Sequence, residues 1–159
     1  MDITEQIMSL LELRIPPVVV GLAFAVAMWT LTRYALALTV VSVAYWMALI
    51  PAVCGALFAI AGVTAFRRGR TTVNPMTPGA STAIVTNGVY RWSRNPMYVG
   101  FAMVLLGWVL YLGNLSAALL LPCYLLYMNR YQITPEERAL QQKFGSEYDN
   151  YTQRVRRWL

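Results

Sequence analysis

The stretch PMYVGFAMVLLGWVLYLGNLSAALLLPCYLLYM, residues 96–128, contains two apolar runs, 96–112 and 115–128. Only Gly113 and Asn114 separate these runs. A helix needs about 20 largely apolar residues to cross the hydrocarbon core of a bilayer, and both runs come near this length. Two short spans joined by so tight a turn form an antiparallel pair. The stretch therefore predicts a helical hairpin in a membrane.

Two further apolar regions precede the hairpin in a chain of 159 residues, 58% of which are hydrophobic. The first covers residues 15–31 and follows an acidic segment, so we interpret it as a retained span and not as a signal peptide. The second, 34–66, is too long for one span at 1.5 Å per residue. We prefer one span at 43–66, although Pro51 is able to divide the region into two. The predicted fold is an all-α integral membrane protein with about four transmembrane helices, or five with a break at Pro51.

Basic residues are concentrated in two segments that flank the hairpin. They are Arg67, Arg68, Arg70, Arg91 and Arg94 before it, and Arg130, Arg138, Lys143, Arg154, Arg156 and Arg157 after it. The positive-inside rule places both segments, and with four spans also the N-terminus, in the cytoplasm. We expect one membrane domain with N-terminal spans (1–66), a cytoplasmic loop (67–95), the hairpin (96–130) and a cytoplasmic tail (131–159).

Several functional classes are disfavoured by composition. The chain has no histidine, the most frequent general base and metal ligand. Cys54 and Cys123 lie within apolar runs without metal-ligand spacing, so we expect no metal site. No two glycines are two positions apart, which excludes the G-x-G turn of soluble nucleotide-binding folds. The net charge of +6 fits contact with anionic lipid, and we expect no nucleic-acid partner.

The segment GVYRWSRNPMYVG, residues 88–100, leads into the hairpin. Asn95 suits the N-cap and Pro96 the first helical position, which explains these two residues by helix initiation alone. Arg91 and Arg94 lie beside a helix N-terminus, where unpaired N–H groups favour an anion. The alternative is that both arginines only reach lipid phosphates.

The tail carries an apolar stripe. Its members recur at three- and four-residue steps and are Leu140, Phe144, Tyr148, Tyr151, Val155 and Trp158. Such a stripe predicts an amphipathic helix, or two helices broken near Gly145, which lies on the membrane interface or covers the mouth of the bundle.

Two acidic residues precede that stripe. Thr134 and Glu137 form a capping box, which by itself explains Glu137, and Glu136 suits the positive end of the same helix. Arg130 closes the last apolar run, either as a snorkelling anchor or as a partner of the two acids. Within the hairpin, Gly100 and Gly107 share one helix face, which alanines of the next span are able to approach.

The motifs GVYRWSRNPMYVG and EERALQQKFGSEYDNYTQRV, which bracket the hairpin, together resemble the isoprenylcysteine carboxyl methyltransferase and phospholipid methyltransferase superfamily of integral membrane enzymes. The resemblance covers residues 71–159. It implies S-adenosylmethionine as cofactor, held at the cytoplasmic face by the loop, the hairpin and the tail helix. The residues it assigns to cofactor binding are Tyr90, Arg94, Asn95, Pro96, Tyr98, Glu136, Glu137 and Leu140.

The resemblance also implies that Arg130 lies near the reacting groups. Glu137 is the second catalytic candidate, because it and Glu136 are the acids near enough in sequence to accept a proton. One position departs from the family pattern, because Asn95 stands where histidine is usual. Asparagine forms hydrogen bonds but does not titrate, so a role that needs a protonated imidazole is in doubt.

The expected function is methyl transfer to a lipophilic small molecule or lipid, and the sequence leaves the acceptor open among carboxylate, amine, phenol and thiol. A carboxylate needs no base, whereas an amine or phenol must lose a proton to Glu136 or Glu137. Two alternatives are an NADPH-dependent reductase of the sterol-reductase type and a non-catalytic membrane scaffold or transporter. Neither the oligomeric state nor the number of spans before Arg67 follows from the sequence.

Overall fold

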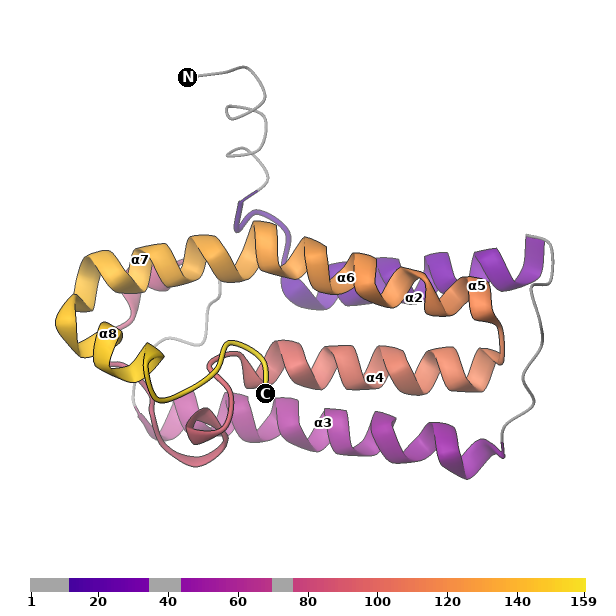
Figure 1. Ribbon diagram of the computed structural model, residues 1–159, viewed down its shortest axis with the longest axis horizontal. Helices are drawn as coiled ribbons and strands as arrows, with labels where there is room; N and C mark the ends of the chain where they lie inside the picture. Colours follow the sequence, from indigo (N-terminus) through magenta and orange to yellow (C-terminus); the bar gives the residue numbers. More distant parts are fainter. Residues whose placement is uncertain (1–11, 35–43, 70–75) are drawn as a thin grey trace, which may run out of the picture.

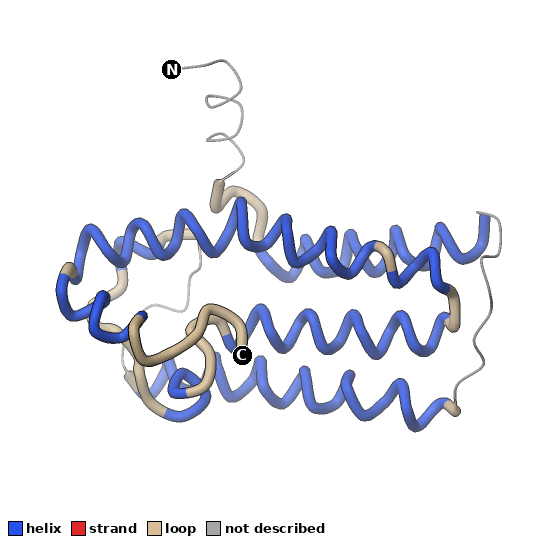
Figure 2. The backbone as a smooth tube through the Cα atoms, in the orientation of Figure 1, coloured by secondary structure: helices blue, strands red, loops and turns tan. Residues whose placement is uncertain are grey.

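The computed structural model describes residues 12–34, 44–69 and 76–159, and these segments form helices and loops without a strand (Figure 2). The elements are α2 (Pro17–Tyr34), α3 (Tyr45–Arg68), η1 (Pro78–Ala80), η2 (Gly88–Arg91), α4 (Pro96–Leu112), α5 (Leu115–Ala118), α6 (Leu120–Met128), η3 (Asn129–Ile133), α7 (Thr134–Phe144) and α8 (Ser146–Thr152). Of these, η1 and η2 are 3₁₀ turns and η3 is a π-helix.

The long helices lie side by side and alternate in direction (Figure 1). Helix α4 is central and contacts α2, α3, α5 and α6. Its bounds coincide with the predicted first arm of the hairpin, because Pro96 occupies the start and Gly113, at φ 62°, ends it. The C-terminus and the segment before α4 meet at one end of the bundle.

Helices α2 and α3 have the length and composition of membrane spans, at 18 and 24 residues. Only 17% and 11% of their most apolar windows are buried inside the protein, whereas a helix from the core of a soluble protein is mostly buried. Large apolar side chains such as Leu22, Leu57 and Ile60 are about 60% exposed, which fits contact with lipid. The protein is therefore an integral membrane protein.

The N-terminal spans follow the prediction closely. Helix α2 lies two to three residues later than the predicted span 15–31. Helix α3 is continuous through Pro51, in agreement with one span at 43–66, so a break at that proline is wrong. The remainder of the long apolar region, 35–43, lies outside the described residues.

The second arm of the hairpin extends beyond Met128, where the sequence predicted its end. The helix continues through the π-helix η3 directly into α7 (Figure 1). Thr134 has helical angles, φ −61° and ψ −43°, and Ile133, which stands at the N-cap of α7, is helical as well. The predicted capping box is wrong, because Thr134 lies inside a continuous helix where N–H groups already have partners.

Close packing of α3 on α4 depends on small residues. A Cβ atom on Gly100 would lie 2.5 Å from the Gly55 carbonyl oxygen, and one on Gly107 would lie 2.6 Å from that of Ala48. These two glycines thus face α3, and the expectation that they meet alanines of the fourth span is wrong. Such contacts let two helix backbones approach in a membrane.

The tail is helical as far as Thr152 and then irregular. Gly145, at φ 50°, separates α7 from α8, which agrees with the alternative of two helices and not with a single helix. Val155 and Trp158 lie beyond α8, so the apolar stripe does not continue to them on a helix. The final residues instead return to the bundle, where the indole nitrogen of Trp158 donates to Asn129 Oδ1 at 3.1 Å.

Candidate functional site

A pocket lies at the end of the bundle where the loop before α4 meets α7 and α8. It contains about 600 Å³ not filled by protein atoms, part of which is open to solvent. Room for water-sized groups within it is about 40 Å³, so the pocket is largely closed by its own side chains. Its lining consists of Phe66, Ser81, Ala83, Ile84, Val85, Tyr90, Arg94, Asn95, Met97, Tyr98, Glu136, Glu137, Leu140, Tyr148 and Tyr151.

The pocket unites the two sequence motifs. Seven of the eight residues expected to hold a cofactor line it, and the eighth, Pro96, is buried in the first turn of α4. Arg130, expected near the reacting groups, is not among the lining residues. Its guanidinium contacts Glu12 at 2.7 Å. Among the described residues, its ion pair is therefore with Glu12 and not with Glu136 or Glu137.

Tyr98 and Glu136 form a hydrogen bond across the pocket. The Tyr98 hydroxyl donates to Glu136 Oε2 at 2.9 Å, and Tyr98 is 2% exposed. Burial of the carboxyl group raises the pKa of Glu136 to about 7, an effect that the Tyr98 hydrogen bond opposes and the charge of Glu137 increases. Glu136 is thus able to gain or lose a proton near neutral pH.

Glu137 binds two arginines. Its Oε1 lies 3.2 Å from the Arg94 guanidinium and its Oε2 lies 2.5 Å from that of Arg157. The side chains of Glu137 and Arg94 are each 15% exposed, which contradicts the interpretation of Arg94 as an arginine that reaches lipid phosphates. Arg91, by contrast, is exposed. The Nε atom of Arg94 is buried without a hydrogen-bond partner among the described residues, so the pocket retains one unused cationic donor.

Asn95 stands at the N-cap of α4 but does not cap it with its side chain. Its carbonyl oxygen accepts from the N–H groups of Tyr98 and Val99, both at 3.0 Å, while its Nδ2 donates to the Arg157 carbonyl oxygen at 2.9 Å. The expected side-chain cap is therefore wrong. The amide instead fixes the C-terminal segment against the start of α4, so that Arg157 reaches Glu137.

The tyrosines of the pocket are neutral hydrogen-bonding and stacking groups. Tyr90 packs edge-on against Phe66, with ring centroids 5.2 Å apart, and its carbonyl oxygen accepts from the Tyr151 hydroxyl at 2.7 Å. Burial raises the pKa of Tyr90, Tyr148 and Tyr151 above its ordinary value. Their phenols consequently remain protonated at neutral pH.

Sequence reasoning missed part of the lining. Tyr148 and Tyr151 belong to the apolar stripe, which indicates burial but no place in a pocket. Arg157 is not a lining residue but contacts Glu137, which is; it follows α8 by several residues, and no local pattern connects the two. The loop residues Ile84 and Val85 carry no motif at all.

Comparison with known proteins gives the family. The sequence pattern of the phospholipid methyltransferase family matches residues 43–147, about two thirds of the chain. The chain belongs to the phospholipid methyltransferase family. This confirms the resemblance inferred from the two motifs.

Three relatives illustrate the similarity. An uncharacterized protein of Haemophilus influenzae is 48% identical over 63 residues, which is 40% of this chain and all of that protein. A protein-S-isoprenylcysteine O-methyltransferase of Schizosaccharomyces pombe is 39% identical over 72 residues, and a probable enzyme of the same name from Oryza sativa subsp. indica is 36% identical over 72. These two matches cover 45% of this chain and only 30% and 38% of the relatives. No solved structure matches the chain.

Proposed function

We propose that this protein is an S-adenosylmethionine-dependent methyltransferase whose acceptor is a lipophilic small molecule or lipid. The observation that carries the proposal is the pocket in which residues 90–98 and 136–140, far apart in sequence, face one another. Membership of the phospholipid methyltransferase family supports the reaction class.

The charges of the pocket suit the polar groups of S-adenosylmethionine. Arg94, with its unused Nε donor, and Arg157 would bind the carboxylate of the cofactor. Glu136 or Glu137 would accept hydrogen bonds from the ribose hydroxyls, as acidic residues do in dinucleotide sites. The ring of Tyr90 and the side chain of Leu140 offer surface to the adenine. Asn95 and Pro96 would shape this site through the backbone at the start of α4.

S-adenosylmethionine supplies an electrophilic methyl group, so the protein must chiefly position the acceptor and exclude water. Tyr98 and Glu136 form a polar part of the pocket lining. If the acceptor is an amine or phenol, Glu136 is the better proton acceptor, because its pKa is about 7, and Glu137 is already engaged by two arginines. Arg130 would orient a carboxylate acceptor only after release from Glu12.

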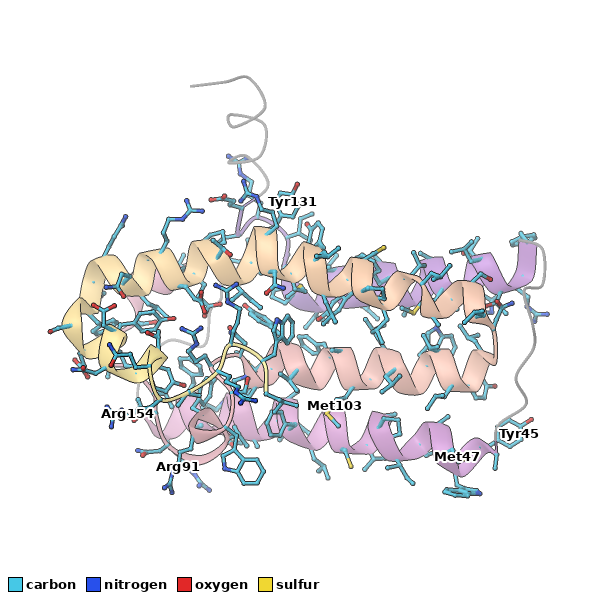
Figure 3. All side chains as sticks on the ribbon, viewed as in Figure 1. Tyr45, Met47, Arg91, Met103, Tyr131 and Arg154 are labelled. Carbon is cyan, nitrogen blue, oxygen red and sulfur yellow. The ribbon has the colours of Figure 1, made fainter. Side chains whose placement is uncertain are left out.

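We further propose that the pocket faces the cytoplasm, together with both termini. Figure 3 places the exposed Arg91 and Arg154 at the pocket end, whereas Tyr45 lies at the opposite end. The two charged residues that end α3, Arg67 and Arg68, also belong to the pocket end. The positive-inside rule favours the cytoplasm for this side.

Calorimetric titration of detergent-purified protein with S-adenosylhomocysteine tests the proposal, with NADPH titrated in parallel. We expect saturable binding of S-adenosylhomocysteine and at least a tenfold loss of affinity in Glu136→Gln. The control is Glu147→Gln, which removes an exposed carboxylate of α8 and leaves the pocket intact. Binding of NADPH alone would favour the reductase, and binding of neither ligand by folded protein would favour the scaffold.

A further inference from the structure

Four arginines and one tryptophan form an exposed group near the pocket end of the bundle. They are Arg67, Arg68, Arg91, Trp92 and Arg156, and all five side chains are exposed. We call this group the basic collar. Arginines 94, 130, 138 and 157 form the ion pairs of the described residues, so the collar arginines carry charge that no acid in these residues neutralises.

Three segments of the chain are joined in the collar. Helix α3 ends in Arg67 and Arg68, and η2 packs on α3 through the edge-on contact of Tyr90 with Phe66. The chain then passes through Arg91 and Trp92 to Arg94, whose N–H group donates to the Arg156 carbonyl oxygen at 2.9 Å. The three segments are thus held together by packing and backbone hydrogen bonds.

Trp92 shows where the collar lies relative to a bilayer. It is 72% exposed although it is large and apolar, and it follows the 3₁₀ turn packed on α3. Tryptophan in this setting is typical of the membrane–water interface, where the ring meets lipid and the indole N–H meets head groups. Arginines at the same level reach the phosphates.

We propose that the basic collar binds the head groups of anionic phospholipids in the surrounding leaflet. Basic residues near an anionic membrane surface are attracted to its head groups. The exposed acids near this end, Glu147 and Asp149, lie on α8 and not on the collar segments. The collar does not depend on the proposed methyltransferase function, because none of its five residues lines the pocket.

Thermal unfolding in nanodiscs tests this proposal. The probes are discs of phosphatidylcholine alone and discs that contain about one third phosphatidylglycerol. We expect the wild-type Tm to be higher in the anionic discs by a few degrees, and salt at about 0.5 M to remove most of the difference because it screens surface charge. The variant with all four collar arginines changed to Gln should lose at least half of the gain.

Arg154 provides the matched control. It is exposed at the same end of the bundle, but its Nε donates to the Asn150 carbonyl oxygen, next to the acids of α8 (Figure 3). Arg154→Gln should keep the gain in full, whereas Arg91→Gln should reduce it. An equal gain in the fourfold variant, no gain in the wild type, or an equal gain from inorganic phosphate in neutral discs would each overturn the proposal. If the fourfold variant does not fold, the single variants and the salt series decide.

Discussion

The hydroxyl of Tyr98 and the carboxylate of Glu136 are 38 positions apart in sequence and 2.9 Å apart in the folded protein. This hydrogen bond connects the first turn of α4 with α7 inside the pocket lining. The first motif and the second are therefore parts of a single site, and the charge state of that site depends on how deeply Glu136 is buried.

Glu136 should make stability depend on pH. Its pKa is about 7 in the folded protein and near 4.5 when exposed, so the folded state binds more protons between these values. Stability should consequently fall as pH rises from about 4.5 to about 7 and change little from this cause above that range. We expect Glu136→Gln to flatten the pH dependence of Tm and to raise Tm at pH 8. A Tm of the variant that falls as steeply as that of the wild type across this window would contradict the burial of this carboxyl group.

Removal of the Tyr98 hydroxyl should raise the pKa of Glu136, as deeper burial of that carboxyl group would. The hydrogen bond from Tyr98 lowers the pKa of Glu136, so Tyr98→Phe should raise it and extend the pH-dependent loss of stability to higher pH. The measurement is Tm at half-unit steps from pH 5 to 9. Tyr111→Phe is a suitable control, because that tyrosine is 57% exposed on the far part of α4.

Glu137 should be needed for stability as well as for binding. Its neutralisation in Glu137→Gln leaves Arg94 and Arg157 without the carboxylate that both contact, and hydrogen bonds to charged groups contribute about 1.5–3 kcal/mol. We expect a lower Tm, together with weaker binding of S-adenosylhomocysteine. Arg138→Gln, which breaks an exposed pair with Glu12, should change Tm by less than about a quarter as much.

Features fixed by neighbouring residues could be predicted from the sequence. Pro96 and Gly113 define both ends of α4, and Gly145 breaks the tail helix where expected, because each position is governed by local backbone preference. The lengths of the apolar runs likewise predicted the spans α2 and α3. Seven residues of the two motifs line one pocket, whereas their assignment to a cofactor came from a family resemblance and stays a prediction.

Features that depend on long-range contacts could not be predicted. A capping box at Thr134 requires a helix start, and the continuous rod from α6 through the π-helix removes that start. Arg157 reaches Glu137 only because Asn95 and Arg94 hold the C-terminal backbone through carbonyl oxygens, which any residue type carries. Glu12, which forms an ion pair with Arg130, lies 118 positions earlier in the chain. No periodic pattern in the sequence predicts such contacts.

The α3–α4 interface should tolerate no added methyl group at Gly100. A Cβ atom there would lie 2.5 Å from a backbone carbonyl oxygen and 2.7 Å from Ala59 Cβ, so Gly100→Ala should separate the helices and cost about 1–3 kcal/mol. Gly21 in α2 is the matched control, because its Cβ would meet nothing within 4 Å. Gly21→Ala should leave Tm unchanged or raise it, since alanine favours helix. Equal Tm values for the two variants would show that α3 and α4 are not so closely packed.

Asn95 should hold the C-terminal segment in place. Asn95→Ala removes the donor to the Arg157 carbonyl oxygen, and the segment 154–159 should then exchange its amide hydrogens at least several-fold faster. Because Arg157 would leave Glu137 more often, affinity for S-adenosylhomocysteine should fall as well. Asn95→His, the form usual in the family, keeps a side-chain N–H donor and should retain most of the protection. Hydrogen-exchange mass spectrometry measures this directly: unchanged exchange in Asn95→Ala would mean that the backbone bond from Arg94 to Arg156 suffices, and that the asparagine serves the pocket in another way.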